Sequence, residues 1–405
     1  MRVLKWISLG LGALVGLAVI GVLVVVWFVD PNSFKSRIES AVRDATGREL
    51  TLAGDIDLAL FPWLSLRTGE GRLGNAEGFG AEPMISWQSA QLGARLLPLL
   101  RGELVADRIT LRGADVRLVR RSDGVANWEG LGGAAGDQAA GSEPMELKIG
   151  GIRVSDSRIS YLDETAGGRE IRIESFAFST DEIVPGEALT DTEIAGVLHV
   201  TGFAPEGIPF RVEVPELIAP KDFSAVQVDE YELVFGSLEI EGGAGGKLDP
   251  EPRIEGSFET NVFDLRALLG NLGVAAPATS DPGTLRELAI AATWTYDAGA
   301  IALDPLSLRV DDTRFTGHFR MNGDESRAGT FELRGDRLDL ARYVPPPDPA
   351  SEPFVLPTAT LKALAFSGLV ELEEATLEDV TLKGMSLRLL LDEAGLRPVS
   401  PQRAP

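Results

Sequence analysis

The sequence predicts a mainly β protein, with an N-terminal transmembrane helix and a short amphipathic helix followed by an elongated antiparallel β-sheet built from repeats. Three observations predict it. A charge-free apolar run lies near the N-terminus, and one short stretch of helical periodicity follows it. The rest of the chain alternates apolar and polar residues in short runs separated by Gly, Asp, Asn and Pro, as strands and turns require. Few further short helices are expected.

The charge-free run covers residues 6–29, and about 20 apolar residues suffice to cross a bilayer core. Arg2 and Lys5 precede the run and Asp30 follows it. By the positive-inside rule, residues 1–5 are therefore predicted to be cytoplasmic. A cleaved signal peptide is the alternative, but it would have a shorter apolar region and an A-x-A-like cleavage site. We expect a retained single-pass anchor, with the remainder of the chain outside the cytoplasm.

A short amphipathic helix is predicted directly after the anchor, beginning at Pro31-Asn32-Ser33. Apolar residues then recur at helical spacing, and Gly47 stands where a C-terminal stop belongs. The residues expected to share one face of this helix are Phe34, Ile38, Ala41, Val42 and Ala45.

Beyond the helix, a unit of two short apolar–polar runs around a corner recurs. It is seen in "RITLRGADVRL" (108–118), "IRVSDSRISY" (152–161) and "DVTLKGMSLRL" (379–389). A partial fourth copy has Leu308, Val310 and Phe315, with Gly317 in the last place. We interpret the unit as a hairpin whose corner reverses the strand, so that its apolar residues share one face. These residues are Ile109, Leu111, Val116, Leu118, Ile152, Val154, Ile159, Tyr161, Val380, Leu382, Leu387 and Leu389.

Shifts in composition divide the part of the chain after the anchor. The Gly-rich stretch 241–246 is expected to be a hairpin loop, because it lacks the Lys and the helix start of a phosphate-binding loop. The predicted regions are an N-terminal region 30–131, a flexible linker 132–144, a β-repeat region 145–343, a Pro-rich linker 344–353, a further β-repeat 354–391 and a tail 392–405.

The composition argues against several classes of function. The 405 residues carry a formal charge of −23, which disfavours nucleic acid as a partner. There is no Cys, and the two histidines, His199 and His318, lie far apart and are expected to be ordinary strand residues. The acidic pairs Asp55/Asp57, Asp311/Asp312 and Glu373/Glu374 lack the spacing of a calcium loop and are expected in solvated turns. No catalytic, cofactor-binding or metal-binding residue is predicted, and we expect no enzymatic activity.

Several segments together resemble the AsmA family of inner-membrane proteins of Gram-negative bacteria. The segment "DGVANWEGL" (123–131) is a fairly specific signature of that family. The resemblance is collinear and is carried by residues 30–75, 96–131, 154–164, 260–274 and 331–346.

The resemblance implies a periplasmic body anchored in the inner membrane and concerned with outer-membrane assembly and envelope lipid homeostasis. Relatives are considered bridge-like lipid-transfer proteins, in which a long curled β-sheet forms a hydrophobic groove. At about 0.8 kcal/mol per exposed CH₂, one 16-carbon chain in water costs about 12 kcal/mol, which an apolar lining removes. The implied partners are inner-membrane phospholipid and envelope proteins at the far end, and the twelve apolar residues above become candidates for the lipid-facing lining.

Alternatives remain open on the sequence alone. A non-transporting scaffold that regulates protein targeting or insertion into the membrane is the second function consistent with the resemblance. Strand alternation fits a closed sandwich as well as an open groove. Family members continue past this point with further strand repeats, so a truncation, a split gene and a short paralogue are all compatible with the sequence. The lipid species, the direction of transport and the oligomeric state are not encoded in any visible motif.

Overall fold

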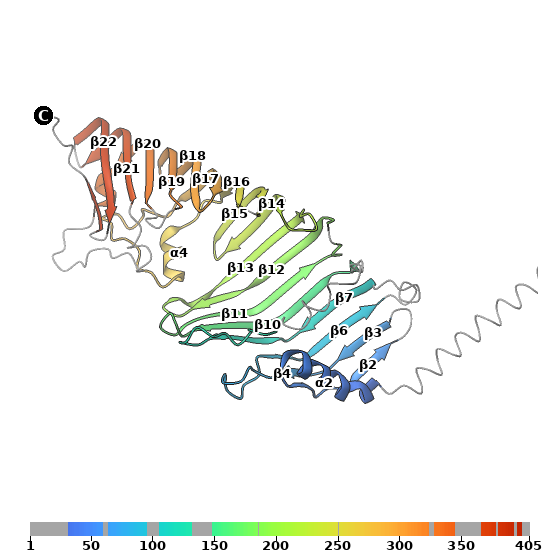
Figure 1. Cartoon of the computed structure of the whole chain (residues 1–405). Helices are drawn as coiled ribbons and strands as arrows, with labels where there is room; N and C mark the ends of the chain where they lie inside the picture. Colours follow the sequence, from blue (N-terminus) through green and yellow to red (C-terminus); the bar gives the residue numbers. More distant parts are fainter. Residues whose placement is uncertain are drawn as a thin grey trace, which may run out of the picture. The chain divides into compact units, whose positions relative to one another are not determined.

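The structure is a computed structural model with strands as its dominant element and few helices (Figure 1). It describes residues 31–59, 64–94, 105–131, 148–184, 186–249, 251–323, 328–344, 366–377, 380–392 and 395–398. Within these ranges no helix is long and apolar enough to cross a membrane. The predicted anchor at 6–29 lies outside the described residues, as do residues 132–144 and 345–353 of the two predicted linkers.

The chain divides into two compact units, Met1–Val184 and Pro185–Pro405. This division falls inside the region 145–343 that composition suggested as one piece. Each unit is described by itself below.

The first unit begins with a 3₁₀ turn and the short helix expected from the sequence. Gly47 ends the helix with a φ of +70° and donates its N–H to the Arg43 carbonyl, as predicted. The elements are η1 (Pro31–Phe34), α2 (Lys35–Thr46), β1 (Leu50–Leu52), β2 (Ile56–Ala59), β3 (Leu64–Thr68), β4 (Gly71–Leu73), β5 (Ile85–Trp87), β6 (Ser89–Ala94), β7 (Val105–Arg112), β8 (Asp115–Arg120), β9 (Lys148–Ile149), β10 (Ile152–Asp163) and β11 (Arg169–Thr180).

Helix α2 covers one end of this unit's sheet. Ile38 and Val42 pack against a small core formed by Leu50, Leu52 and Ile56. Side chains of the helical segment also cap the strand edge: Glu39 accepts the Leu52 N–H and Asn32 accepts the Ile56 N–H. The helix therefore both buries apolar surface and satisfies edge donors that would otherwise invite another strand.

The hairpin interpretation is wrong for three of the four repeat copies. Strands β7 and β8 both run parallel to the same strand β10, so the chain keeps its direction through the corner. The copies at 152–161 and 380–389 each lie within a single strand, β10 and β22. Only the partial copy reverses, in a tight turn where Val310 pairs with Thr313.

In each of these three copies the corner is a kink, because it contains one residue with positive φ. These residues are Gly113, Asp156 and Gly384. In β10 the kink is a β-bulge, with a register shift against β11 between Val154 and Ser157. A bulge inserts one residue and so changes which face the following residues occupy. This explains how apolar residues separated by an odd spacing of five remain on one face.

The second unit is a ladder in which strands pair in the order of the chain (Figure 1). Neighbours are antiparallel throughout, except that β20 and β21 are parallel. The elements are β12 (Leu189–Val200), β13 (Phe203–Leu217), β14 (Ala225–Phe235), β15 (Leu238–Lys247), β16 (Arg253–Thr260), α4 (Leu265–Asn271), β17 (Leu288–Asp297), β18 (Ala300–Val310), β19 (Thr313–Met321), β20 (Gly329–Asp339), α5 (Leu340–Tyr343), β21 (Phe366–Leu377), β22 (Val380–Asp392) and β23 (Gly395–Pro398).

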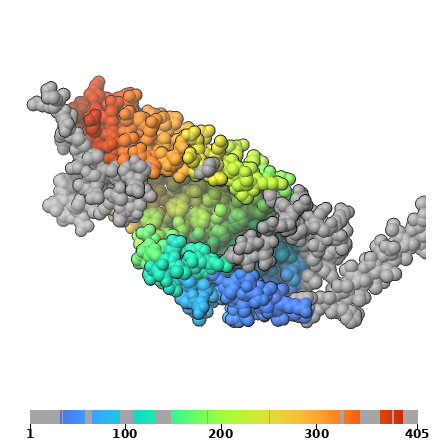
Figure 2. Space-filling view, in the orientation of Figure 1, coloured from blue at the N-terminus to red at the C-terminus, as the bar shows by residue number. Residues whose placement is uncertain are grey.

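The core of the second unit is small and local. One cluster forms where α4 places Leu268 beside Phe263 and Leu288, and another contains Phe315 and Leu372. Strands β14, β15, β16 and β18 contain no buried residue in the part that the structure describes. The sheet is thus a single layer over these strands, whose colours run from yellow-green to orange in Figure 2.

The Gly-rich stretch 241–246 is not the hairpin loop that we expected. It lies in strand β15, and the Tyr231 side chain lies over Gly242. The same pairing of a ring with a glycine recurs where Trp294 lies over Gly256 and Phe331 over Gly368. A neighbouring aromatic ring covers the space that a side chain would fill, which lets glycine persist inside a strand.

We expect Gly368→Ala to lower the free energy of unfolding by about 1–3 kcal/mol, because overpacking displaces a well-placed ring. The added Cβ would stand 2.5 Å from the Phe331 ring. Urea denaturation followed by circular dichroism measures the change. Gly270→Ala is the matched control, because a Cβ in that helix meets nothing within 4 Å. Equal stability of the two variants would contradict the proposed role of the ring.

Candidate functional site

Eight of the twelve predicted lining residues lie together in the first unit, on one face of β7, β8 and β10. We call this face the unit-1 apolar face. Strand β11 extends it, because Phe178 pairs with Val154, Ile173 with Ile159 and Ile171 with Tyr161. All eight side chains are half-buried. The cross-strand pairs are Ile109–Ile152, Leu111–Val154, Val116–Ile159 and Leu118–Tyr161.

The other four predicted residues lie in β22 of the second unit. Val380, Leu382 and Leu387 are 58%, 47% and 36% exposed. Leu387 pairs with Val370 of β21, and Leu389 with Gly368. The structure thus separates the predicted set into two groups, one in each unit.

A larger apolar face in the second unit was not predicted. We call it the unit-2 apolar face, and it consists of rows of cross-strand partners that run from β14 to β22. Period-two alternation within each strand could have revealed it, but the repeat template selected only strands with the five-residue spacing. One row is Tyr231, Gly242, Phe258, Ala292, Leu306, Gly317, Leu333, Val370 and Leu387, and the next is Val228, Ala244, Gly256, Trp294, Leu303, Phe319, Phe331, Gly368 and Leu389.

Charged side chains occupy the opposite face of the same strands. Arg334 pairs with Glu371 at 3.0 Å, and Arg337 with Glu374 at 3.6 Å. Glu373 and Glu374 lie within strand β21, not in the solvated turn that we expected. Exposed ion pairs of this kind contribute about 0–1 kcal/mol each. Their main consequence is that the two faces of the sheet differ sharply in polarity.

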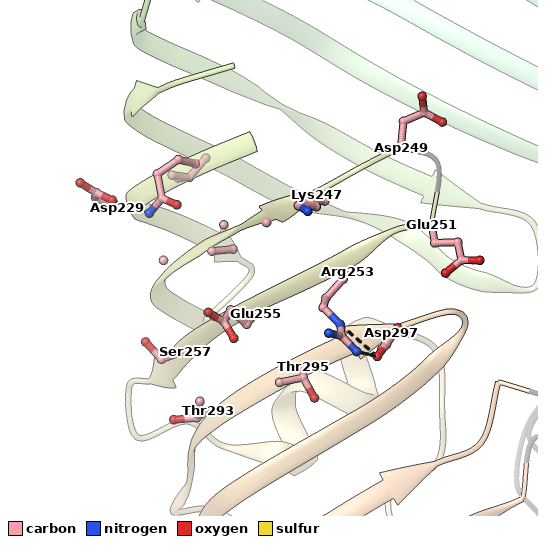
Figure 3. Close-up of a pocket in the computed structure, with 17 residues that line it drawn as sticks. Asp229, Lys247, Asp249, Glu251, Arg253, Glu255, Ser257, Thr293, Thr295 and Asp297 are labelled. Atoms are coloured by element: carbon pink, nitrogen blue, oxygen red, sulfur yellow. Dashed lines mark hydrogen bonds and ion pairs between the residues drawn. The ribbon is translucent and has the colours of Figure 1, made fainter. Parts of the chain in front are cut away.

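A polar hollow of about 1180 Å³, which was not predicted, lies on the charged face over strands β14–β17. Figure 3 shows Arg253 of β16 reaching toward Asp297 of β17, with Thr295 near them and Thr293 farther along the strand. Lys247 and the Ser257 hydroxyl also line it. Within the described ranges, no three His, Cys, Asp or Glu side chains gather where they could hold a metal ion. The hollow can offer hydrogen bonds to a polar ligand.

The signature segment 123–131 is a loop held in place by hydrogen bonds of one buried side chain. Asn127 is fully buried, and its side-chain oxygen accepts the Val119 N–H at 2.9 Å. Its amide donates to the Arg117 carbonyl and to the Asn75 side chain. Three hydrogen bonds thus tie the loop to strand β8 and to residue 75, which gives the segment a structural role.

A second buried polar group fixes the loop before β17. Asp311 is 5% exposed, so it does not lie in a solvated turn as expected. Its carboxylate accepts the N–H groups of Leu285, Arg286 and Glu287 and the hydroxyl of Tyr343. Burial alone would raise the pKa of Asp311, but these hydrogen bonds outweigh it and hold the pKa below its ordinary value.

The two histidines lie in strands, as predicted. His199 belongs to β12 and His318 to β19. His318 pairs across the ladder with Glu332 and lines a small polar hollow with Arg388.

Comparison with known proteins gives a consistent result. The family model described as "AsmA family" matches residues 1–211, just over half of the 405 residues. The chain is 27% identical to Protein AsmA of Escherichia coli (strain K12) over 163 residues. That alignment covers 38% of this chain and 26% of the relative, so the match spans about a quarter of the relative's length. No solved structure gives a significant match.

We expect Asn127→Ala to lower the free energy of unfolding by about 1–3 kcal/mol, because three partly buried groups lose their hydrogen bonds to the buried Asn127 side chain. Thermal or urea denaturation measures the loss. Asn271→Ala is the control, since Asn271 is exposed at the end of α4. If the control loses as much stability as Asn127→Ala, the hydrogen bonds of Asn127 do not explain the loss.

Replacing Asp311 should make stability depend less on pH. Its depressed pKa means that the carboxylate stabilises the fold above about pH 4 and stops doing so as the pH falls through the folded-state pKa. We expect Asp311→Asn to cost about 1–3 kcal/mol at pH 7, with the difference from wild type shrinking below about pH 4. Denaturation series at several pH values test this. Asp312→Asn, at the exposed neighbour, should change stability by less than about 1 kcal/mol, and a pH-independent loss in Asp311→Asn would refute the assignment.

Proposed function

Because the chain belongs to the AsmA family, we propose that it acts in the bacterial envelope. In this proposal residues 6–29 anchor it in the inner membrane, with a cytoplasmic N-terminus and the strands in the periplasm. Its role there concerns outer-membrane assembly and envelope lipid homeostasis, without enzymatic activity.

We further propose that the two apolar faces shield phospholipid acyl chains. The observation that carries this proposal is the unit-2 apolar face, where rows of apolar residues continue across β14–β22 while β14, β15, β16 and β18 hold no buried residue in the described part. In a closed sandwich a second layer would bury such residues. A half-exposed apolar face of this extent is instead typical of a surface that binds an apolar partner.

The energetics favour lipid as that partner. Each acyl CH₂ moved from water to an apolar surface gains about 0.8 kcal/mol, with no need for reactive groups. The ladder also suits a path along the sheet, because each added strand extends it by about 4.8 Å. Lipid that lies across successive strands meets the same alternation at every step.

Native mass spectrometry of gently purified full-length protein tests the proposal. Co-purifying phospholipid supports it. Protein that carries no lipid but retains a stable protein partner supports the scaffold function instead and contradicts shielding.

A charge placed on the unit-1 apolar face should lower the amount of bound lipid and leave the protein folded. The test variants are Leu111→Asp and Ile159→Asp. Both residues are half-buried, so a carboxylate there keeps partial contact with water and lowers the free energy of unfolding less than it would in a core. Thr110→Asp is the matched control, because Thr110 pairs with Gln91 and Arg153 on the other face. Circular dichroism and co-purified lipid are the measurements. If both apolar-face variants unfold, or if both keep as much lipid as wild type, the unit-1 apolar face does not shield lipid and that part of the proposal fails.

A further inference from the structure

The unit-1 apolar face ends in a charged row. Arg120 lies two residues after Leu118 in β8, and Asp163 two residues after Tyr161 in β10. Arg169 lies two residues before Ile171 in β11. Asp163 is the cross-strand partner of both arginines. Residues two apart in a strand share a face. The two arginines therefore lie on the same face as the apolar side chains, at its border.

Neither arginine makes an ion pair in the part of the chain that the structure describes. Asp163 lies between them, but its carboxylate accepts the Tyr161 hydroxyl at 3.0 Å and the N–H and hydroxyl of Thr165 at 2.9 and 2.6 Å. Several other arginines of this unit have a carboxylate partner: the Arg112–Asp156 pair, for example, is 3.0 Å long. Arg120 and Arg169 are exposed and remain available for an anion.

Aromatic rings border the same row. The Arg120 guanidinium lies 5.9 Å from the centre of the Trp128 ring, within the range of a cation–π contact. Trp128 and Tyr161 approach with ring centres 6.0 Å apart. Trp and Tyr suit positions with one apolar and one wet side, as at the level of lipid headgroups.

We propose that Arg120 and Arg169 bind the phosphate of a glycerophospholipid whose acyl chains lie on the unit-1 apolar face. This inference rests on the proposed lipid-shielding function and adds the headgroup contact. The guanidinium fork matches phosphate oxygens, and two of them on neighbouring strands offer donors to one phosphate. The rings of Trp128 and Tyr161 cover the glycerol region between the charged row and the apolar rows.

The test compares two lipids that have identical oleoyl chains, phosphatidylglycerol and diacylglycerol, which lacks the phosphate. Full-length protein in a non-ionic detergent is titrated with each and analysed by native mass spectrometry. We expect wild type to bind phosphatidylglycerol about tenfold more tightly than diacylglycerol. R120Q/R169Q should lose that preference and still bind diacylglycerol.

The matched control is R72Q/R153Q, which removes two exposed arginines of the same unit. Arg72 pairs with Thr51 and Ser86, and Arg153 with Thr110 and Ser179, so neither continues the unit-1 apolar face. This control should keep the preference for phosphatidylglycerol. A loss of preference in both double variants would indicate a general charge effect and overturn the site.

Further outcomes separate this inference from the function on which it rests. If wild type binds both lipids equally and R120Q/R169Q changes nothing, the headgroup site fails while lipid shielding stands. If wild type binds neither lipid, both proposals fail. If inorganic phosphate alone binds wild type as tightly as phosphatidylglycerol does, and depends on the same arginines, the site takes free phosphate and the lipid assignment is overturned.

Discussion

The constraint on which the structure depends is that each strand has one apolar and one polar face, and the apolar faces need a cover. Most domains provide it with a second layer. Here the described residues provide it only locally. Helix α2 packs near Leu50 and Leu52, and α4 places Leu268 beside Phe263. A third cluster contains Phe315 and Leu372. In the described parts of β14, β15, β16 and β18 no side chain is buried, and the hydrogen bonds of the ladder, rather than a deep core, hold these strands to their neighbours.

Much of this could be predicted from local sequence, because alternation is a local property. The helix at 31–46, its stop at Gly47, the strands and the shared face of Ile109, Leu111, Val116 and Leu118 all follow from spacing. The direction of the chain after Gly113 could not be predicted in this way. A glycine with positive φ serves a turn and a bulge equally well, and the choice depends on β10, whose kink at Asp156 matches it from more than 40 residues along the chain.

Two other expectations were wrong because the structure at those positions also depends on residues from another element. The stretch 241–246 has the composition of a loop, yet it forms part of strand β15, where the Tyr231 side chain of the neighbouring strand β14 lies over Gly242. Asp311 belongs to an acidic pair of the kind found in solvated turns. Its carboxylate is nevertheless buried and accepts hydrogen bonds from three backbone N–H groups and from the Tyr343 hydroxyl. In both cases the partner comes from another element, so the composition of the stretch itself does not reveal it.

The five-residue spacing of the repeat nevertheless contains more information than the hairpin interpretation used. In a straight strand, Leu111 and Val116 would lie on opposite faces, because an odd separation changes the face. Both lie on the unit-1 apolar face only because the kink between them adds one residue, and Val154 and Ile159 repeat the arrangement on β10. A pattern that keeps apolar residues on one face across a kink is expected where that face must stay continuous while the strand bends. The same argument extends to the border of the face, because Arg120 and Arg169 continue its spacing by two and so place their charge on the same side of the sheet as the apolar rows.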